Sequence, residues 1–304
     1  MTIASGNRHS LAFVAEVTYG TIPSSPVWTD VRHTACTIGL TKETVESEEI
    51  RADRQITCFR HGNRAVGGSV EGELSYSSYD TLLEAALCGT WSADVLKAGT
   101  TRRSFTFERK FADITQYLRY TGCEVNSVSI SCAPNSMVGI SVDIIGQDME
   151  APAQTTVSGF SYSAAITTCQ FDSFNATLTE GGSPIALITA LEMTIENGLE
   201  AQYVIGDDET QRPTIGKSRV SGSATVYFED QAMLNKFANE TESSIVLLLT
   251  DPDGNTLQFS IPELKYTSGQ PDVSGTGSVS LSMSFQAMYN TAAASNIVIT
   301  RNPI

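Results

Sequence analysis

Apolar and polar residues alternate along much of the chain, and this alternation is the dominant pattern of the sequence. The clearest stretch is 277–287, where apolar residues alternate with serines: Val279, Leu281, Met283 and Phe285 against Ser278, Ser280, Ser282 and Ser284. Segments 69–74, 125–132 and 191–197 alternate in the same way. A period of two is that of a β-strand with one packed face and one polar face. The sequence therefore predicts a mainly β protein whose strands keep one side wet.

Helical spacing occurs in only two short segments. Segment 77–89 offers Ser77 or Ser78 as an N-cap and Gly89 as a stop, and segment 229–239 offers Asp230 as a cap. Each predicts a helix of two to three turns. The run DPDGN at 251–255 lies between two strand patterns and predicts a hairpin turn, because Asp-Gly adopts tight-turn conformations at low cost.

A local motif is written twice, about half the chain length apart. RAVGGSVEGELSY (64–76) and SRVSGSATVYFED (218–230) align without a gap, so that Val66 matches Val220 and Gly68 matches Gly222. Leu40 lies 28 residues before Gly68 and Ile195 lies 27 before Gly222, each expected to end a strand. Both copies of the motif lead into one of the predicted helices. A repeat on this scale indicates a duplicated structural unit.

The repeated unit is predicted to be a strand, a long polar loop, the Gly-Ser strand, a short helix and hairpin strands. The two long polar segments are 41–63 and 196–217, and the boundary falls near residue 153 in a stretch rich in Pro, Thr and Gly. We expect two tandem β-sandwich or barrel units, 1–153 and 154–304, each with one short α-helix. Two units per chain let three chains form a ring of six, whose sheets close into a large ring-shaped β-barrel.

Charge and cysteine content narrow the function. The 304 residues carry 34 acidic and 19 basic side chains, a net charge of −15, which argues against a surface that binds nucleic acid through its phosphates. The six cysteines form no C-x-x-C pair and predict reduced thiols of a cytoplasmic protein. No segment approaches the roughly 20 apolar residues of a membrane span, so we expect no membrane contact.

Candidate catalytic and metal-binding residues are absent from the pattern. The three histidines have no metal-ligand spacing to another His or Cys. The DPDGN run starts like a calcium loop but has Thr256 and Pro262 where Gly and Glu are required. No nucleophile–base–acid set is recognisable. The sequence predicts no catalytic residue, no metal site and no cofactor, and therefore no enzyme.

The segments 47–91, 97–131 and 171–206 resemble the tail tube proteins of long-tailed bacteriophages. The most specific elements are EEIRADRQ (48–55) and HGN (61–63) ahead of the Gly-Ser strand, which are similar to one branch of that family. The resemblance implies a virion tail protein, made in the host cytoplasm, that polymerises as stacked rings into a channel for DNA ejection. It also implies as partners the tape measure, tail terminator and tail tip proteins, and passing double-stranded DNA without specific binding. Many tail tube proteins are single-unit hexamers, so the three-chain ring follows from the repeat alone.

Within this interpretation two sets of residues are candidate functional sites. Four carboxylates on polar strand faces are expected to line the lumen and repel phosphates: Glu71, Glu73, Glu192 and Glu196. The loop Thr41–Val66 is expected to contact the next ring through mixed charges: Glu43, Glu46, Glu48, Glu49, Arg51, Arg54, Arg60 and Arg64. The alternatives are carboxylates on an outer solvated face and a plain solvated loop.

Three other functions compete with a tube of a long non-contractile tail. The first is a tube of a contractile tail or injection machine, which the sequence does not separate from it. The second is a soluble β-sandwich that binds carbohydrate, which requires an aromatic platform, whereas Trp28 and Trp91 are isolated in the sequence. The third is an enzyme, for which no set of catalytic residues is found.

Overall fold

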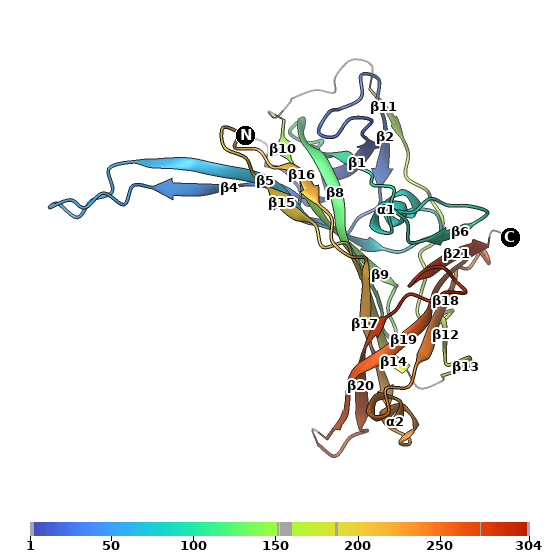
Figure 1. Ribbon diagram of the computed structural model, residues 1–304. Coiled ribbons are helices and arrows are strands. Elements are labelled where there is room, and N and C mark those ends of the chain that lie inside the picture. The colour runs from blue at the N-terminus through green and yellow to red at the C-terminus, as the bar shows by residue number, and fades with distance from the viewer. Residues whose placement is uncertain (1–2, 151, 153–159, 186–187, 274, 303–304) are drawn as a thin grey trace.

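The computed structural model describes residues 3–150, 152, 160–185, 188–273 and 275–302. The chain is mainly β, and the described part contains two α-helices, α1 (Asp80–Ala86) and α2 (Ala232–Ala238) (Figure 1). This confirms the predicted fold class and the two short helices. The expected unit boundary at residue 153 lies outside the described residues.

Both helices begin slightly later than expected. Tyr79 rather than a serine precedes α1, and Gln231 precedes α2. Asp230 still contributes, because its Oδ1 accepts a hydrogen bond from the Ala232 amide at 2.8 Å. No helix in the described ranges combines the length and apolar character needed to cross a membrane.

One long sheet runs through the whole molecule, and all neighbouring strands in it are antiparallel. Its order is β4 (Gly39–Glu46), β5 (Phe59–Glu73), β9 (Gly139–Gly146), β8 (Gln116–Cys132), β14 (Ile188–Glu196), β17 (Arg219–Tyr227), β20 (Ser280–Ala287) and β19 (Thr256–Asp272). The short β3 (Ala35–Cys36) extends the line of β4 along β5. The eight strands thus form a single surface with two faces.

A second layer covers one face, and it is built in two parts because β8 and β19 leave the long sheet at their N-terminal halves. Around β8 lie β11 (Ser161–Ser163), β2 (Val27–Val31), β1 (His9–Ala15), β7 (Phe105–Phe111) and β10 (Asp148–Met149). Around β19 lie β13 (Ser183–Pro184), β12 (Thr177–Glu180), β18 (Ser243–Thr250), β21 (Val298–Asn302) and β6 (Val95–Lys97). A separate hairpin joins β15 (Glu200–Gln202) to β16 (Gln211–Thr214).

The same succession of pairings occurs twice in the long sheet. The order β4-β5-β9-β8 is followed by β14-β17-β20-β19, and the two sets meet at the β8–β14 pair. Helix α1 packs on β8, and α2 packs on β19. The registers agree as well: Leu40 is opposite Val66, and Ile195 is opposite Val220. Leu40 does not end its strand, however, since β4 continues to Glu46.

The core lies between the long sheet and the second layer. The apolar positions of each alternating strand point into it. Of the four apolar residues predicted for segment 277–287, Leu281, Met283 and Phe285 are buried in β20, whereas Val279 precedes the strand and is half-buried. Leu82, Leu83, Ala85 and Ala86 of α1 are also buried. The DPDGN turn connects β18 to β19 as predicted, with the Asp251 carboxylate accepting from the Asn255 amide at 2.8 Å. Alternation therefore correctly separated core positions from surface positions.

The long polar segment expected as a loop at Thr41–Val66 is instead a β-hairpin. Strands β4 and β5 pair from Gly39–Gly67 out to Glu46–Phe59, and the Ser47 amide donates to the Cys58 carbonyl at 3.0 Å. Figure 1 shows this hairpin, residues 41–63, projecting far from the body; we call it the arm. The backbones of two strands can pair without an apolar face. Because both faces of this hairpin are exposed, its sequence shows no alternation from which the strands could have been predicted.

Candidate functional site

The open face of the long sheet is polar along its whole width. Serines and threonines dominate it: Ser69, Ser127, Ser129, Ser131, Ser141, Thr194, Ser221, Ser223, Thr225, Ser282 and Ser284. Cross-strand contacts between hydroxyls add to the strand pairing, as between Ser129 and Thr194, whose oxygens are 2.9 Å apart. We call this surface the polar face.

The four carboxylates singled out in the sequence lie on this polar face. Glu71 is opposite Ser141, and Glu73 is opposite Gly139 one pleat further along. Glu192 lies between Ser131 and Ser223, and Glu196 lies next to Ser127 and Arg219. Glu71, Glu192 and Glu196 are exposed, and Glu73 is partly covered. One sheet thus brings together carboxylates that are more than a hundred residues apart.

A fifth carboxylate on the same face was missed. Asp143 of β9 lies between Ser69 and Ser127, and its Oδ2 accepts a hydrogen bond from Asn126 Nδ2 at 3.1 Å. The alternation of Ser141 and Asp143 with buried Ile140, Val142 and Ile144 was the signal that could have found it. Arg219 and Lys265 are cations of the same face. Carboxylates outnumber them, so the face is acidic.

The arm presents a different surface. Every residue from 41 to 61 is exposed, including all of the predicted ring-contact residues except Arg64. Several apolar side chains are exposed among the charges, with Ile50 at 100% and Ile56 at 62%. A two-stranded ribbon without a core is marginally stable in water. The arm therefore exposes both charged and apolar side chains along its whole length.

Within the arm, charges pair only locally. At the tip the Arg51 guanidinium lies 2.8 Å from the Asp53 carboxylate, and the hydrogen bonds of this exposed pair raise the pKa of Arg51 and lower that of Asp53. Glu49 accepts a hydrogen bond from the Thr57 hydroxyl at 3.3 Å. Arg54 and Arg60 are exposed on the same hairpin, where another molecule can reach them.

Arg64 behaves differently from the rest of the predicted set, because it is at the base of the arm and is engaged within the chain. Its guanidinium lies 2.6 Å from Glu209, 3.3 Å from Asp148 and 3.5 Å from Asp208. Its amide also donates to the Asp208 carbonyl at 2.8 Å. Arg64 thus ties the arm to the segment between β15 and β16.

The second long polar segment, 196–217, does not project like the arm but folds back against the body of the chain. Glu124 of β8 is almost fully buried there and accepts from Arg212 at 2.7 Å and from Arg102. Two guanidinium groups compensate the buried charge of this carboxylate, so its role is to hold the folded segment in place. The two equivalent connections, β4–β5 and β14–β17, therefore differ: the first projects and the second covers the sheet.

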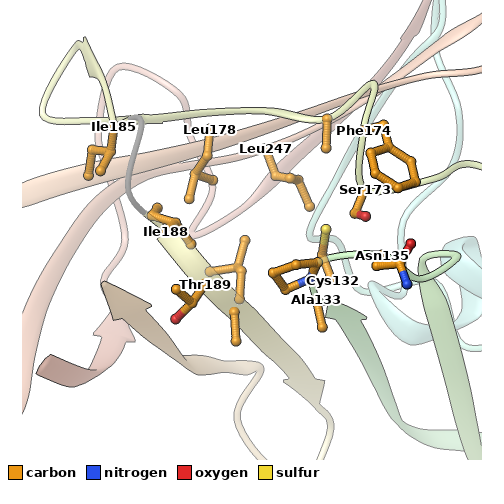
Figure 2. Close-up of a pocket in the computed structure, with 14 residues that line it drawn as sticks. Cys132, Ala133, Asn135, Ser173, Phe174, Leu178, Ile185, Ile188, Thr189 and Leu247 are labelled. Atoms are coloured by element: carbon orange, nitrogen blue, oxygen red, sulfur yellow. The ribbon is translucent and has the colours of Figure 1, made fainter. Parts of the chain in front are cut away.

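One pocket among the described residues is apolar and carries no catalytic groups. It has a volume of about 290 Å³ and is lined mostly by apolar side chains such as Leu178, Ile188 and Leu247 (Figure 2). Cys132 and Ser173 lie at its wall, but no histidine, carboxylate or amine lines it. A nucleophile needs an adjacent base, so this pocket does not form a site for covalent chemistry.

Neither a metal-ligand cluster nor an exposed pair of tryptophans occurs in the part of the chain that the structure describes. In the ranges that the structure describes, no cluster of three or more His, Cys, Asp or Glu residues could hold a metal ion. Trp28 is fully buried against Phe160, and the Arg301 guanidinium covers Trp91 at 4.4 Å from the ring centre. The two tryptophans therefore do not make the exposed platform that a carbohydrate-binding module requires.

Comparison with known proteins agrees with a structural role. No curated protein matches the chain at a significant level. A family model described as phage tail tube protein matches residues 6–287, nearly the whole chain and both copies of the repeated strand arrangement. Members of this family are structural components of the virion tail that associate with copies of themselves into a tube. With its duplicated run of antiparallel strands and its acidic open face, this chain belongs to the phage tail tube protein family.

Proposed function

We propose that the chain assembles into rings of three copies, and that stacked rings form the tube through which DNA is ejected from the virion. The observation that carries this proposal is the repeated order β4-β5-β9-β8 and β14-β17-β20-β19 in one sheet. Two equivalent units, 1–153 and 154–304, give each chain two positions in a ring. Three chains then supply six equivalent positions.

The polar face is proposed to line the channel. The opposite face is buried under the second layer, so only the polar face is free to surround a lumen. Glu71, Glu73, Glu192 and Glu196, joined by Asp143, would give this lumen a negative potential. Negative charge repels the phosphates of DNA, so that the duplex slides without binding.

The arm is proposed to contact the next ring in the stack. Its two isoleucines and most of its charged side chains are exposed to solvent, where a neighbouring ring could contact them. Each such contact would be repeated once for every chain in the ring. Individual surface ion pairs contribute about 0–1 kcal/mol, but several identical contacts act together. Arg64 is proposed to hold the base of the arm, which leaves Arg51, Arg54 and Arg60 for the neighbouring ring.

In the virion this tube would contact the tape measure protein inside and the tail terminator and tip proteins at its ends. The resemblance of the motif block 47–91 to long-tailed phages supports a tail tube, and the tube of a contractile tail fits the same residues. Electron microscopy of the purified chain tests the central proposal: we expect tubes or rings, with three chains per ring in a reconstruction. Six chains per ring would overturn the three-chain assembly, and a protein that remains monomeric at high concentration would overturn the tube.

A further inference from the structure

Among the residues that the structure describes, the long sheet has two edges without a partner strand. Beyond Leu264, β19 pairs with β20 on one side only. At the other end, β3 and β4 pair only with β5 in the part of the chain that the structure describes. Unpaired N–H and C=O groups on an exposed edge are templates for another strand. We call these segments, 264–272 and 35–42, the two free edges; in the second, the Ile38 carbonyl already accepts a hydrogen bond from Arg109 at 2.6 Å, which leaves residues 39–42 for pairing.

The pairing inside the chain shows what each free edge is equivalent to. Val128 of β8 is opposite Val142, which is opposite Val70; Gly269 of β19 is opposite Met283, which is opposite Ala224. Since Val70 and Ala224 hold corresponding places after Gly68 and Gly222, Gly269 takes the place of Val128. By the same route through Val66 and Val220, Leu40 takes the place of Ile195.

A shared irregularity supports this equivalence. The ladder between β8 and β9 has a bulge at Asn126, between Val125 and Ser127. The ladder between β19 and β20 has a bulge at Thr267, between Tyr266 and Ser268. Bulges are position-specific features of a sheet, so their coincidence fixes the alignment of β19 on β8 without reference to sequence similarity.

In β8 the corresponding edge is already occupied. Strand β14 pairs with it, with Glu196 opposite Ser127, Ile195 opposite Val128 and Thr194 opposite Ser129. This internal contact is continued at the bulge, where the Asn197 amide donates to the Asn126 carbonyl at 2.8 Å. The β8–β14 pair within the chain is therefore a model for the strand pairing that could form at the two free edges.

We propose that the free edge of β19 pairs with the free edge of β3 and β4 of a second copy, in the register of the β8–β14 contact. Ser268 then lies opposite Thr41 of the other copy, Gly269 opposite Leu40, and Gln270 opposite Gly39. This proposal rests on the ring assembly proposed above and specifies which strands join the copies.

The side chains of the two edges fit this arrangement. Leu40 is only half-buried although it packs against the core, and a neighbouring strand would cover it. Thr41 and Ser268 are both exposed, and their counterparts Glu196 and Ser127 lie on the polar face, so the pairing would continue that face into the next copy. Pro271 lacks an N–H and is tolerated at an edge, which would limit the pairing to the residues before it.

Cysteine pairs test the register directly. In a Cys58→Ser, Cys169→Ser background, which removes the two exposed thiols, Thr41→Cys combined with Ser268→Cys places the thiols opposite one another. Directly opposed residues lie about 4.5–5.5 Å apart, within the range of a disulfide. We expect oxidised tubes to run as covalent multimers that a reductant returns to monomer. Mixing the two single-cysteine chains should give only dimers, because each chain then carries one reactive edge.

The matched control is Thr41→Cys with Gln270→Cys, which keeps the same face but shifts the register by two residues. The diagonal distance exceeds disulfide reach, so we expect a yield lower by on the order of tenfold. Tubes that form normally but cross-link through the control pair, or through neither pair, would overturn the register while leaving the tube intact. Absence of tubes in the unmodified chain would overturn the underlying assembly as well.

Hydrogen exchange gives a second measurement on the unmodified chain. The amides of 266–270 and 39–42 that face the free edges should exchange readily in the monomer and become protected in rings. Persistent exchange at both edges in assembled rings would contradict the pairing, whatever the cysteine variants do.

Discussion

Gly68 and Gly222 occupy the same position in two copies of one strand arrangement, and both are held against the backbone of the preceding strand. A Cβ at Gly68 would lie 2.6 Å from the carbonyl oxygen of Thr37, and a Cβ at Gly222 would lie 2.2 Å from that of Glu192. The second nearest backbone in each case belongs to Ile38 and Met193, themselves equivalent. The sequence match between the two glycines thus reflects a shared steric requirement.

Alanine at either glycine should destabilise the fold. Gly222→Ala forces the paired backbones apart, and Gly68→Ala adds strain because its φ of +133° is rarely adopted by other residues. We expect each to lower the free energy of unfolding by about 1–3 kcal/mol, the usual cost of overpacking. Urea denaturation measures this directly. Gly67→Ala is the control, since its nearest neighbour would lie 4.0 Å away; equal losses at Gly67 and Gly68 would contradict the steric explanation.

Reversing the charge of carboxylates on the polar face should make the tube bind DNA. Glu71→Lys with Glu192→Lys removes repulsion and adds cations on a face where both side chains are exposed. We expect assembly to persist, and purified tubes to retain short duplex DNA at low salt with an affinity that falls steeply as salt rises.

The matched control for that experiment is Glu229→Lys with Glu240→Lys, which changes net charge equally at exposed positions outside the polar face. Retention of DNA should be weak in this variant. If both pairs of substitutions bind DNA alike, net charge and not the polar face governs the interaction.

Shortening the arm should separate folding from stacking. Replacing residues 47–58 with an Asn-Gly turn removes the exposed tip, and a two-residue type I′ turn closes the remaining strands. Because every residue from 41 to 61 is exposed and none belongs to the core, we expect an unchanged melting temperature and isolated rings in place of tubes. Electron microscopy and thermal unfolding of one preparation provide both measurements.

Point variants refine the test of the arm. Ile50→Asp should weaken stacking, whereas Val17→Asp, at a comparably exposed position away from the arm, should not. Hydrogen exchange should show the tip unprotected in the monomer and protected in tubes, with the paired bases of β4 and β5 protected in both. Tubes of normal length and salt resistance in the shortened variant would show that the arm is not the connector.

A histidine pair in the second layer predicts a pH dependence. Arg109 Nε donates to His9 Nε2 at 3.2 Å, so His9 is neutral and its Nδ1–H donates to His33 Nε2 at 2.8 Å. Burial, and then the charges of His33 and Arg109, lower the pKa of His9 from 6.5 to about 4. Between these values the unfolded chain binds more protons than the folded protein. The stability due to neutral His9 is complete above pH 6.5 and is lost as the pH falls towards 4.

Urea titrations between pH 5 and 7 measure this effect, and His9→Gln should make the pH slope shallower than in the natural chain. His61→Gln, on the exposed arm, should leave the slope unchanged. An identical slope in all three proteins would show that another group is responsible.

How far the sequence predicted the structure differs between its parts. The two faces were predicted correctly for residues 127–131 of β8, 191–196 of β14 and 280–285 of β20, because buried positions in a strand must be apolar and recur every second residue. The four lumen candidates were placed on one face for the same reason. The arm was not recognised, since both of its faces are exposed and its strands have no alternation to detect. Asp143 follows the same alternation, since every second residue of β9 is buried, but no strand was predicted in this segment.

By itself, then, the sequence determined the β class, the two helices, the side of each alternating strand that is buried, and the repeat of Gly68 at Gly222. These properties depend on neighbours within a few residues or on direct comparison of two segments. Only the tertiary structure decided which strands lie side by side, that β4 and β5 form a projecting arm, and that Arg64 pairs with Glu209, 145 residues away. Such contacts depend on how backbone hydrogen bonds and charges are satisfied between distant segments, and no local pattern of side chains records that choice.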